Sequence, residues 1–85
     1  MKGVGTEMLG SIKKNELIQK RLNKNLSQHR LSHLAGLGNN AVFRMENTEC
    51  KVNSLRAKAV ADVLNCHIYE IFDMQNKKGD LIDLD

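Results

Sequence analysis

The amino-acid sequence predicts an all-α domain of five helices. Its 85 residues suffice for one domain with a modest core. The chain has no proline and no tryptophan, and an aromatic content of 4% disfavours a β-sandwich. Apolar residues recur at three- and four-residue steps through residues 13–73, and no strand pair is apparent. We therefore expect a helical domain at 13–73 between a flexible, glycine-rich arm at 1–12 and an acidic tail at 74–85.

The first two predicted helices lie before a glycine turn. In the first, over residues 13–25, apolar side chains fall along one side: Leu17, Ile18 and Leu22, followed by Leu26. Ser27 is a favourable N-cap for the second helix, which should run to about Ala35. Gly36 stands where a left-handed residue is needed to stop that helix, so a tight turn is expected there.

Three more predicted helices follow the turn. The third begins at about Asn39 and ends near Glu46. Asn53 or Ser54 caps the fourth, whose apolar residues repeat at helical steps: Ala57, Val60, Ala61 and Leu64. A short fifth helix is expected after His67, with an inward face of Ile68, Ile71 and Phe72.

Residues 27–46 have the pattern of two short helices joined by the glycine turn. Five apolar side chains are spaced to close the corner between them: Leu31, Ala35, Leu37, Val42 and Met45. Packing of these side chains leaves the outer face of the second helix of the pair free to enter a nucleic-acid groove. The corner therefore predicts a protein that reads double-stranded DNA.

The outer face of the third helix carries side chains that can read bases. A turn of about 100° per residue places these side chains outward: Asn39, Asn40, Phe43, Arg44 and Asn47. Asn can pair bidentately with adenine and Arg with guanine. Phe43 either packs on a thymine methyl group or folds back against the protein. Arg44 reads a base, clamps a phosphate or is solvated.

Charge is distributed unevenly around a formal net charge of +3. Residues 1–60 carry eleven Lys or Arg and four acids, whereas residues 61–85 carry two and six. The basic part suits a polyanion, although a merely solvated cationic face would give the same pattern. Six side chains are candidates for sequence-independent attraction to DNA: Lys13, Lys14, Lys20, Lys24, Arg30 and Lys51.

Four short motifs carry a family resemblance. They are L-S-Q-x-x-L at 26–31, A-G-L at 35–37, R-M-E-N at 44–47 and A-x-x-L at 61–64. On these, the chain resembles the Cro and C1 repressor type of helix-turn-helix protein, in the lambda-repressor-like superfamily, over roughly residues 17–72. The resemblance implies five helices and binding to operator DNA as a transcriptional regulator, frequently as a two-fold dimer.

The resemblance also implies roles for individual residues. Asn39, Asn40, Phe43 and Arg44 match positions that touch base edges. Gln28 matches a contact to the DNA backbone, and the expected backbone set comprises Lys24, Ser27, Gln28, Asn47 and Lys51. For Ser27, a purely capping role is the alternative. Arg21 and Glu46 match an ion pair that ties the reading helix to the scaffold, and we expect this pair to be partly buried.

Three positions depart from the family pattern. Ser32 replaces an alanine, Thr48 often a glycine, and Val52 often a proline. A left-handed turn at Thr48 would cost a β-branched residue about 1 to 2 kcal/mol. The loop after the third helix is therefore expected to follow a different path, which weakens the case for phosphate contacts from it.

Other chemistries are disfavoured. His29 and His33 stand four residues apart but are too few for a metal site unless Cys50, Cys66 or His67 joins them. The two cysteines are expected to stay reduced. No catalytic set is apparent, so neither an enzyme nor a cofactor is expected. No membrane span or secretory signal is seen, which predicts a cytoplasmic protein.

The sequence thus predicts a repressor, of a phage or mobile element, that acts by occupying its operator. A palindromic operator and a homodimer through the fifth helix are expected. With no sensory domain apparent, control should come through concentration, partners or degradation. The alternative is an antitoxin or another protein-interaction module of the same fold, in which the acidic tail, the fifth helix and Phe43 bind a protein partner.

Overall fold

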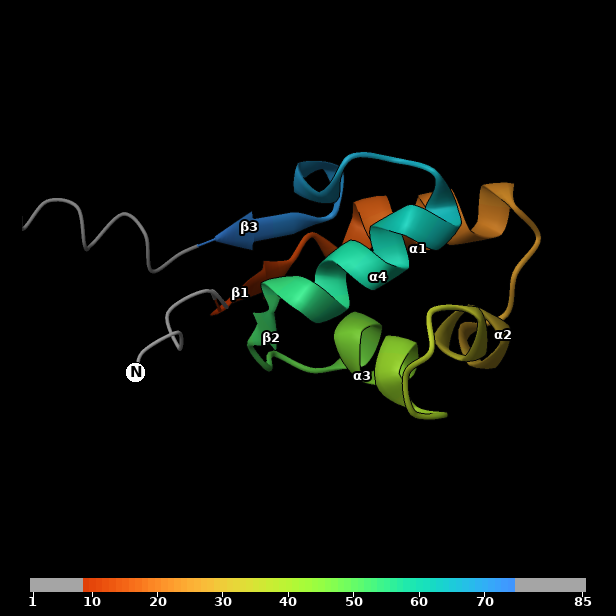
Figure 1. The fold of residues 1–85 in the computed structure, drawn as a ribbon, viewed down its shortest axis with the longest axis horizontal. Helices are drawn as coiled ribbons and strands as arrows, with labels where there is room; N and C mark the ends of the chain where they lie inside the picture. Colours follow the sequence, from red (N-terminus) through yellow and green to blue (C-terminus); the bar gives the residue numbers. More distant parts are fainter. Residues whose placement is uncertain (1–8, 75–85) are drawn as a thin grey trace, which may run out of the picture.

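The computed structural model describes residues 9–74, which fold as four α-helices, one short 3₁₀ helix and a small sheet (Figure 1). In chain order the elements are β1 (Leu9–Ile12), α1 (Lys14–Asn23), α2 (Gln28–Leu34), α3 (Ala41–Asn47), β2 (Val52–Asn53), α4 (Ser54–Leu64), η2 (Ile68–Glu70) and β3 (Phe72–Met74). The strands gather at one end of the molecule and α2 lies at the other (Figure 1).

Helices α2 and α4 begin at the caps that the sequence indicates. The Ser27 hydroxyl accepts a hydrogen bond of 2.9 Å from the Arg30 N–H, at the start of α2. The Asn53 side chain accepts one of 2.9 Å from the Arg56 N–H, at the start of α4. Each cap satisfies a backbone donor that has no partner within its helix.

The core lies between the helices and one face of the sheet. Its buried side chains come from every region of the described chain: Ile12, Leu17, Leu31, Val42, Met45, Val52, Ala57, Val60, Ala61, Leu64, Ile71 and Phe72. Helix α4 contacts α2, η2 and all three strands, so it is the central support. Leu22, which the periodicity of α1 places on the apolar side, is 52% exposed and lies outside the core.

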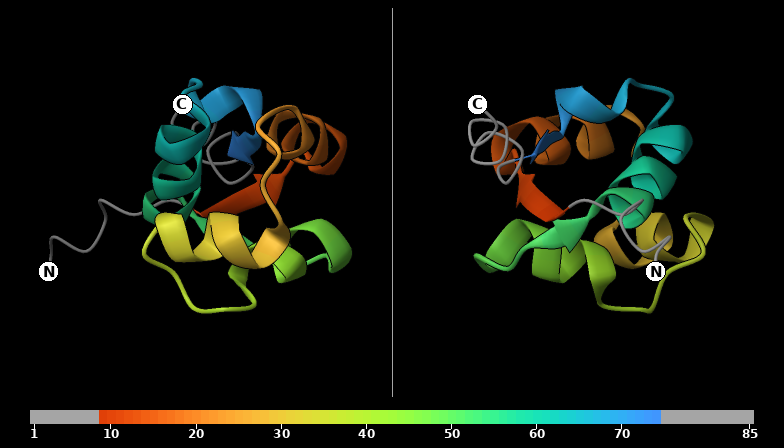
Figure 2. Two further views of the ribbon diagram at one scale, coloured as in Figure 1. Left: turned by 90° about the vertical axis from the view of Figure 1, so that its right-hand side faces the viewer. Right: turned by 60° about the vertical axis from the view of Figure 1, so that its left-hand side comes forward.

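The sheet corrects the prediction of an all-α domain of five helices. Its three strands are antiparallel in the order β2-β1-β3, and β1 pairs Leu9 with Asn53 and Ile12 with Phe72. The right-hand view in Figure 2 brings this end of the molecule forward. The predicted flexible arm at 1–12 is therefore wrong for residues 9–12, which form the central strand. Residues 1–8 lie outside the described residues.

The segment after α4 also differs from the prediction. Instead of a fifth α-helix it forms η2 and then β3. His67 caps η2 by accepting from the Tyr69 N–H through Nδ1, and Glu70 accepts from the His67 N–H. After the single turn of η2 the backbone becomes extended and forms β3. Pairing with β1 satisfies the backbone hydrogen bonds of this segment, so the helix does not need to continue. Of the predicted acidic tail, residues 75–85 lie outside the described residues.

Candidate nucleic-acid interface

Helices α2 and α3 meet at a tight corner. Gly36 has φ +74°, the left-handed conformation expected where the chain leaves α2. The Leu37 N–H donates to the Ser32 carbonyl at 2.9 Å, which closes the turn. The chain then reaches Asn40, the N-cap residue of α3, and the helix begins at Ala41, two residues later than the start at Asn39 predicted from the sequence.

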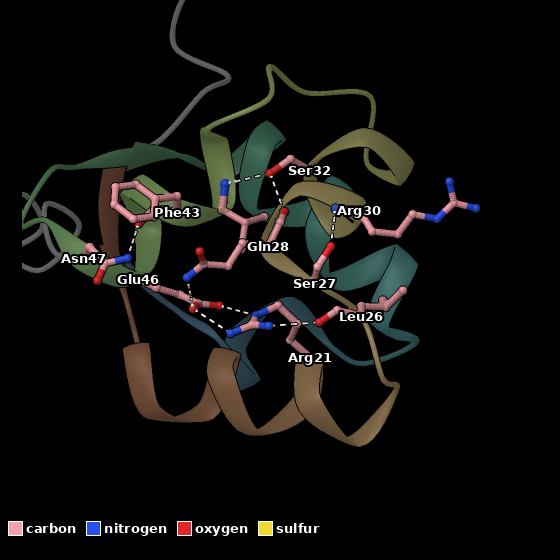
Figure 3. Close-up of polar contacts among 10 residues, drawn as sticks. Arg21, Leu26, Ser27, Gln28, Arg30, Ser32, Phe43, Glu46 and Asn47 are labelled. Carbon is pink, nitrogen blue, oxygen red and sulfur yellow. Dashed lines mark hydrogen bonds and ion pairs between the residues drawn. The ribbon is translucent and has the colours of Figure 1, made fainter.

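Ser32 links the two helices through its hydroxyl. This fully buried group donates to the Gln28 carbonyl and accepts from the Val42 N–H, each at 2.9 Å (Figure 3). The second bond satisfies a donor in the first turn of α3, where the helix provides no partner. The sequence shows a serine where the family pattern has alanine, but only the structure shows that the hydroxyl joins α2 to α3.

An ion pair between Arg21 and Glu46 fixes the buried side of α3 to α1. The Arg21 guanidinium bonds both carboxylate oxygens of Glu46, at 2.7 and 3.0 Å, and also donates to the Leu26 carbonyl (Figure 3). The two side chains are 12% and 3% exposed. The partly buried ion pair expected from the sequence is therefore present. Its bidentate geometry fixes the orientation of α3 as well as its position.

Gln28 belongs to the same hydrogen-bonded group. Its side-chain amide donates to a Glu46 oxygen at 2.8 Å. The sequence predicts Gln28 as a DNA-backbone contact, and the structure places its side chain half-buried against α3. A carboxamide nitrogen has two hydrogens, so one N–H remains for a phosphate oxygen.

The outer face of α3 is open to solvent. All five side chains predicted to point outward are exposed: Asn39, Asn40, Phe43, Arg44 and Asn47. Phe43 is 48% exposed, so it does not fold back into the core. Within the described part of the chain, the side chains of Asn39, Asn40 and Arg44 form no hydrogen bond or ion pair. The three are therefore free to bond with groups outside the protein.

The end of α3 is partly occupied by its own hydrogen bonds. The Asn47 side chain donates to the Phe43 carbonyl at 2.9 Å, and the Thr48 hydroxyl donates to the Arg44 carbonyl at 2.7 Å. Thr48 has φ −130° and ψ 168°, so the loop runs in extended conformation without a left-handed turn. Thr48 thus avoids the strained left-handed conformation, and Lys51 lies exposed on the loop.

Ion pairing within the protein narrows the set of cations that can attract DNA. Ion pairs join Lys14 to Glu49, Lys20 to Glu70, Arg21 to Glu46 and Lys58 to Asp62. Lys24 and Arg30 are exposed and form no ion pair within residues 9–74. Of the six cations considered from the sequence, Lys14 and Lys20 are thus partly neutralised. The hydrogen bond with Glu70 raises the pKa of Lys20.

The histidines and cysteines do not converge. Among the described residues, no group of three His, Cys, Asp or Glu side chains is placed to hold a metal ion. Cys50 and Cys66 are free thiols, and burial raises the pKa of Cys66, which disfavours its thiolate. Similarly, no helix of the described residues is long and apolar enough to cross a membrane.

A rigid corner with an exposed, amide-bearing second helix defines the class of helix-turn-helix DNA-binding domains. Comparison with known families agrees, since the family model described as Helix-turn-helix matches residues 17–71. The chain belongs to this family, in its Cro/C1-type branch, and is a DNA-binding regulator of transcription. A search of the curated proteins finds no match.

Proposed function

We propose that the protein is a sequence-specific repressor that inserts α3 into the major groove and acts by occupying its operator. The observation that carries this proposal is the contrast between the two sides of α3. On one side, Val42, Met45 and Glu46 are buried against the scaffold. On the other, the Arg44 guanidinium stands exposed and unpaired on α3, and the unpaired amides of Asn39 and Asn40 stand exposed just before it, while the Arg21 bonds fix the orientation of the helix.

Base recognition falls to four side chains in this proposal. Asn39 and Asn40 offer carboxamides to the edge of adenine, and Arg44 offers its guanidinium to the edge of guanine. Each such pair gives about 1 to 3 kcal/mol of discrimination. Phe43 covers a thymine methyl group, which would remove its half-exposed ring from water.

Backbone contacts surround this reading face. Ser27 and Gln28 lie at the start of α2, where the remaining Gln28 N–H and the Ser27 hydroxyl can meet phosphate oxygens. Lys24 and Lys51 add sequence-independent attraction to the DNA backbone. The Asn47 side chain donates one N–H to the Phe43 carbonyl, so its second N–H can contact a phosphate oxygen. These contacts set the position of α3 on the duplex without selecting a sequence.

We further propose a homodimer on a palindromic operator. Two copies would read half-sites about 34 Å apart, one turn of the duplex. A fifth helix cannot supply the interface, because residues 68–74 form η2 and β3. We assign the contact to the surface of η2 instead, where Tyr69 is 48% exposed. An origin in a phage or mobile element stays a prediction from the sequence.

The decisive experiment is selection of bound sequences from a random duplex pool. The unmodified protein should enrich one motif, with binding that weakens as salt rises. Asn40→Ala and Arg44→Ala should each relax the preference at one or two positions, by about 1 to 3 kcal/mol per base pair. Lys24→Ala should instead weaken binding to all sequences alike and reduce the salt slope by about 1.

Lys58→Ala is the matched control for Lys24→Ala. Lys58 is an exposed lysine on α4 whose charge is already paired with Asp62. Its removal should leave both the selected motif and the salt slope unchanged. If Asn40→Ala and Arg44→Ala select the same motif as the unmodified protein, the assignment of the reading face is wrong. If no motif is enriched at all, the protein-interaction module becomes the better reading.

A further inference from the structure

A pocket lies beside α3, next to the reading face. It has a volume of about 310 Å³ and is formed by the side of α3, the loop into β2, the start of α4 and the first residue of β1. Its walls combine Arg44, Lys51 and Arg56 with the apolar side chains of Leu9, Met45 and Val52. Arg44 therefore belongs both to the pocket and to the exposed side of α3.

The charge of the pocket favours an anion. Among the described residues, its lining contains the guanidinium groups of Arg44 and Arg56 and no Asp or Glu. Within residues 9–74, the guanidinium groups of Arg44 and Arg56 form no hydrogen bond or ion pair. Each guanidinium presents a planar fork of donors that matches a carboxylate or phosphate. The two arginines thus provide an anion site whose donors are not used by the protein.

The size and apolar wall of the pocket favour an organic anion over a bare phosphate. Liquid water occupies about 30 Å³ per molecule, so a volume of about 310 Å³ corresponds to about ten water molecules, which is room for an organic molecule of at least about ten non-hydrogen atoms. Met45 and Val52 are buried side chains that give the pocket an apolar wall, and Leu9 adds a half-exposed one. Because Met45 and Val52 are only 4% and 6% exposed, an apolar body would gain mainly by covering Leu9, which is 52% exposed. Inorganic phosphate would leave this apolar surface exposed to water.

We propose that this pocket binds a small organic anion, consisting of one carboxylate or phosphate group on an apolar body of about ten non-hydrogen atoms. The anionic group lies against Arg44 and Arg56, and the body lies against Leu9, Met45 and Val52. Occupancy holds the Arg44 guanidinium in the pocket and thereby withdraws it from DNA. This regulatory consequence, unlike the binding itself, rests on the proposed function. It would give the DNA-binding domain an effector site of its own.

The binding is tested without DNA, with 2-naphthoate as the probe. In a ¹H–¹⁵N spectrum of the full chain, 2-naphthoate should shift the amides around Arg44, Val52 and Arg56 in a saturable manner. Neutral 2-naphthamide lacks the negative charge, and inorganic phosphate lacks the apolar body. Each should therefore bind at least about tenfold more weakly than 2-naphthoate. Arg56→Gln should weaken 2-naphthoate binding about threefold to fivefold, as expected for loss of one partly solvated charge contact.

The matched control is Lys58→Gln. It removes a positive charge from the same helix but outside the pocket, so it should bind 2-naphthoate like the unmodified protein. Equal binding of 2-naphthamide and 2-naphthoate would overturn the proposal, as would scattered shifts or no effect of Arg56→Gln. Shifts of the same amides with a DNA duplex but not with 2-naphthoate would also overturn it and assign the pocket to a backbone phosphate.

A competition experiment tests the regulatory consequence. With the selected duplex, 2-naphthoate should lower the apparent DNA affinity in a concentration-dependent manner, and 2-naphthamide should not. Full DNA affinity at saturating 2-naphthoate would overturn the consequence. A protein that binds 2-naphthoate as described but selects no DNA motif would refute the proposed function and leave the pocket assignment standing.

Discussion

The α2–α3 corner and the sheet end of this domain are built in different ways. The corner is local: its cap, its turn and the Ser32 bridge join residues within about fifteen positions of one another. The sheet end is not, because β1 near the start of the described chain pairs with β3 at its end. Contacts between distant residues have no local sequence signal, so the two regions differ in how far the sequence reveals them.

The two regions also differ in what stabilises them. The corner depends on buried polar groups: the Ser32 hydroxyl joins α2 to α3, and the bonds between Arg21 and Glu46, which are 25 positions apart, fix α3 to α1. The geometry of the sheet end depends instead on close packing of the backbone. A Cβ atom on Gly10 would lie 2.3 Å from the Asp73 carbonyl oxygen and 2.7 Å from the Phe72 ring. We therefore expect the corner to be most sensitive to loss of charge and the sheet end to added volume.

The largest effect should come from removing one partner of the buried pair. Arg21→Met leaves the Glu46 carboxylate, 3% exposed, without its counter-ion. The expected loss is about 3 to 5 kcal/mol in the free energy of unfolding, measured by urea denaturation. Arg21→Met combined with Glu46→Gln removes both charges and keeps an acceptor for the Gln28 amide, so it should recover much of the loss. No recovery would show that the hydrogen-bond geometry, and not the stranded charge, dominates.

A smaller effect is expected at the sheet end from Gly10→Ala. The added methyl group meets backbone at the β1–β3 pairing, which must shift to admit it, at a cost of about 1 to 3 kcal/mol. Gly38→Ala is the matched control, since nothing lies within 4 Å of the Cβ position there. Its effect on the unfolding midpoint should stay within about 0.5 kcal/mol. Equal effects of the two substitutions would contradict the packing seen around β1.

The smallest effect should be a pH dependence that comes from Glu70 at the η2 turn. The hydrogen bond from Lys20, followed by that from the His67 N–H, holds the pKa of Glu70 below its ordinary value. Its contribution to stability is therefore complete above the unfolded-state pKa, about 4.3, and is lost as the pH falls through the lower folded-state value. Glu70→Gln should flatten the fall of the urea midpoint between about pH 5 and pH 3. An unchanged pH profile would show that this exposed pair contributes nothing measurable.

The exposed side of α3 could be predicted from the sequence because helical periodicity places Phe43 and Arg44 on the outer side, and the structure shows both exposed. Asn39 and Asn40 are exposed as well, but they precede the helix, which begins two residues later than the sequence predicts. The engagement of Gln28 with Glu46 could not be predicted in the same way. It depends on the distance between α2 and α3, which the packing of the whole core decides.

The sequence by itself determined the register of the helices, the caps at Ser27 and Asn53 and the glycine turn, because each depends on residues close together in the chain. Tertiary structure decided the fate of residues 9–12 and 67–74, which became strands and a 3₁₀ turn once they could pair across the domain. It also brought Leu9 beside Arg44 and Arg56 to form the pocket. A helix satisfies its hydrogen bonds within its own segment, whereas a strand needs a neighbouring strand. These segments could therefore become strands only where the tertiary structure brought such a neighbour to them.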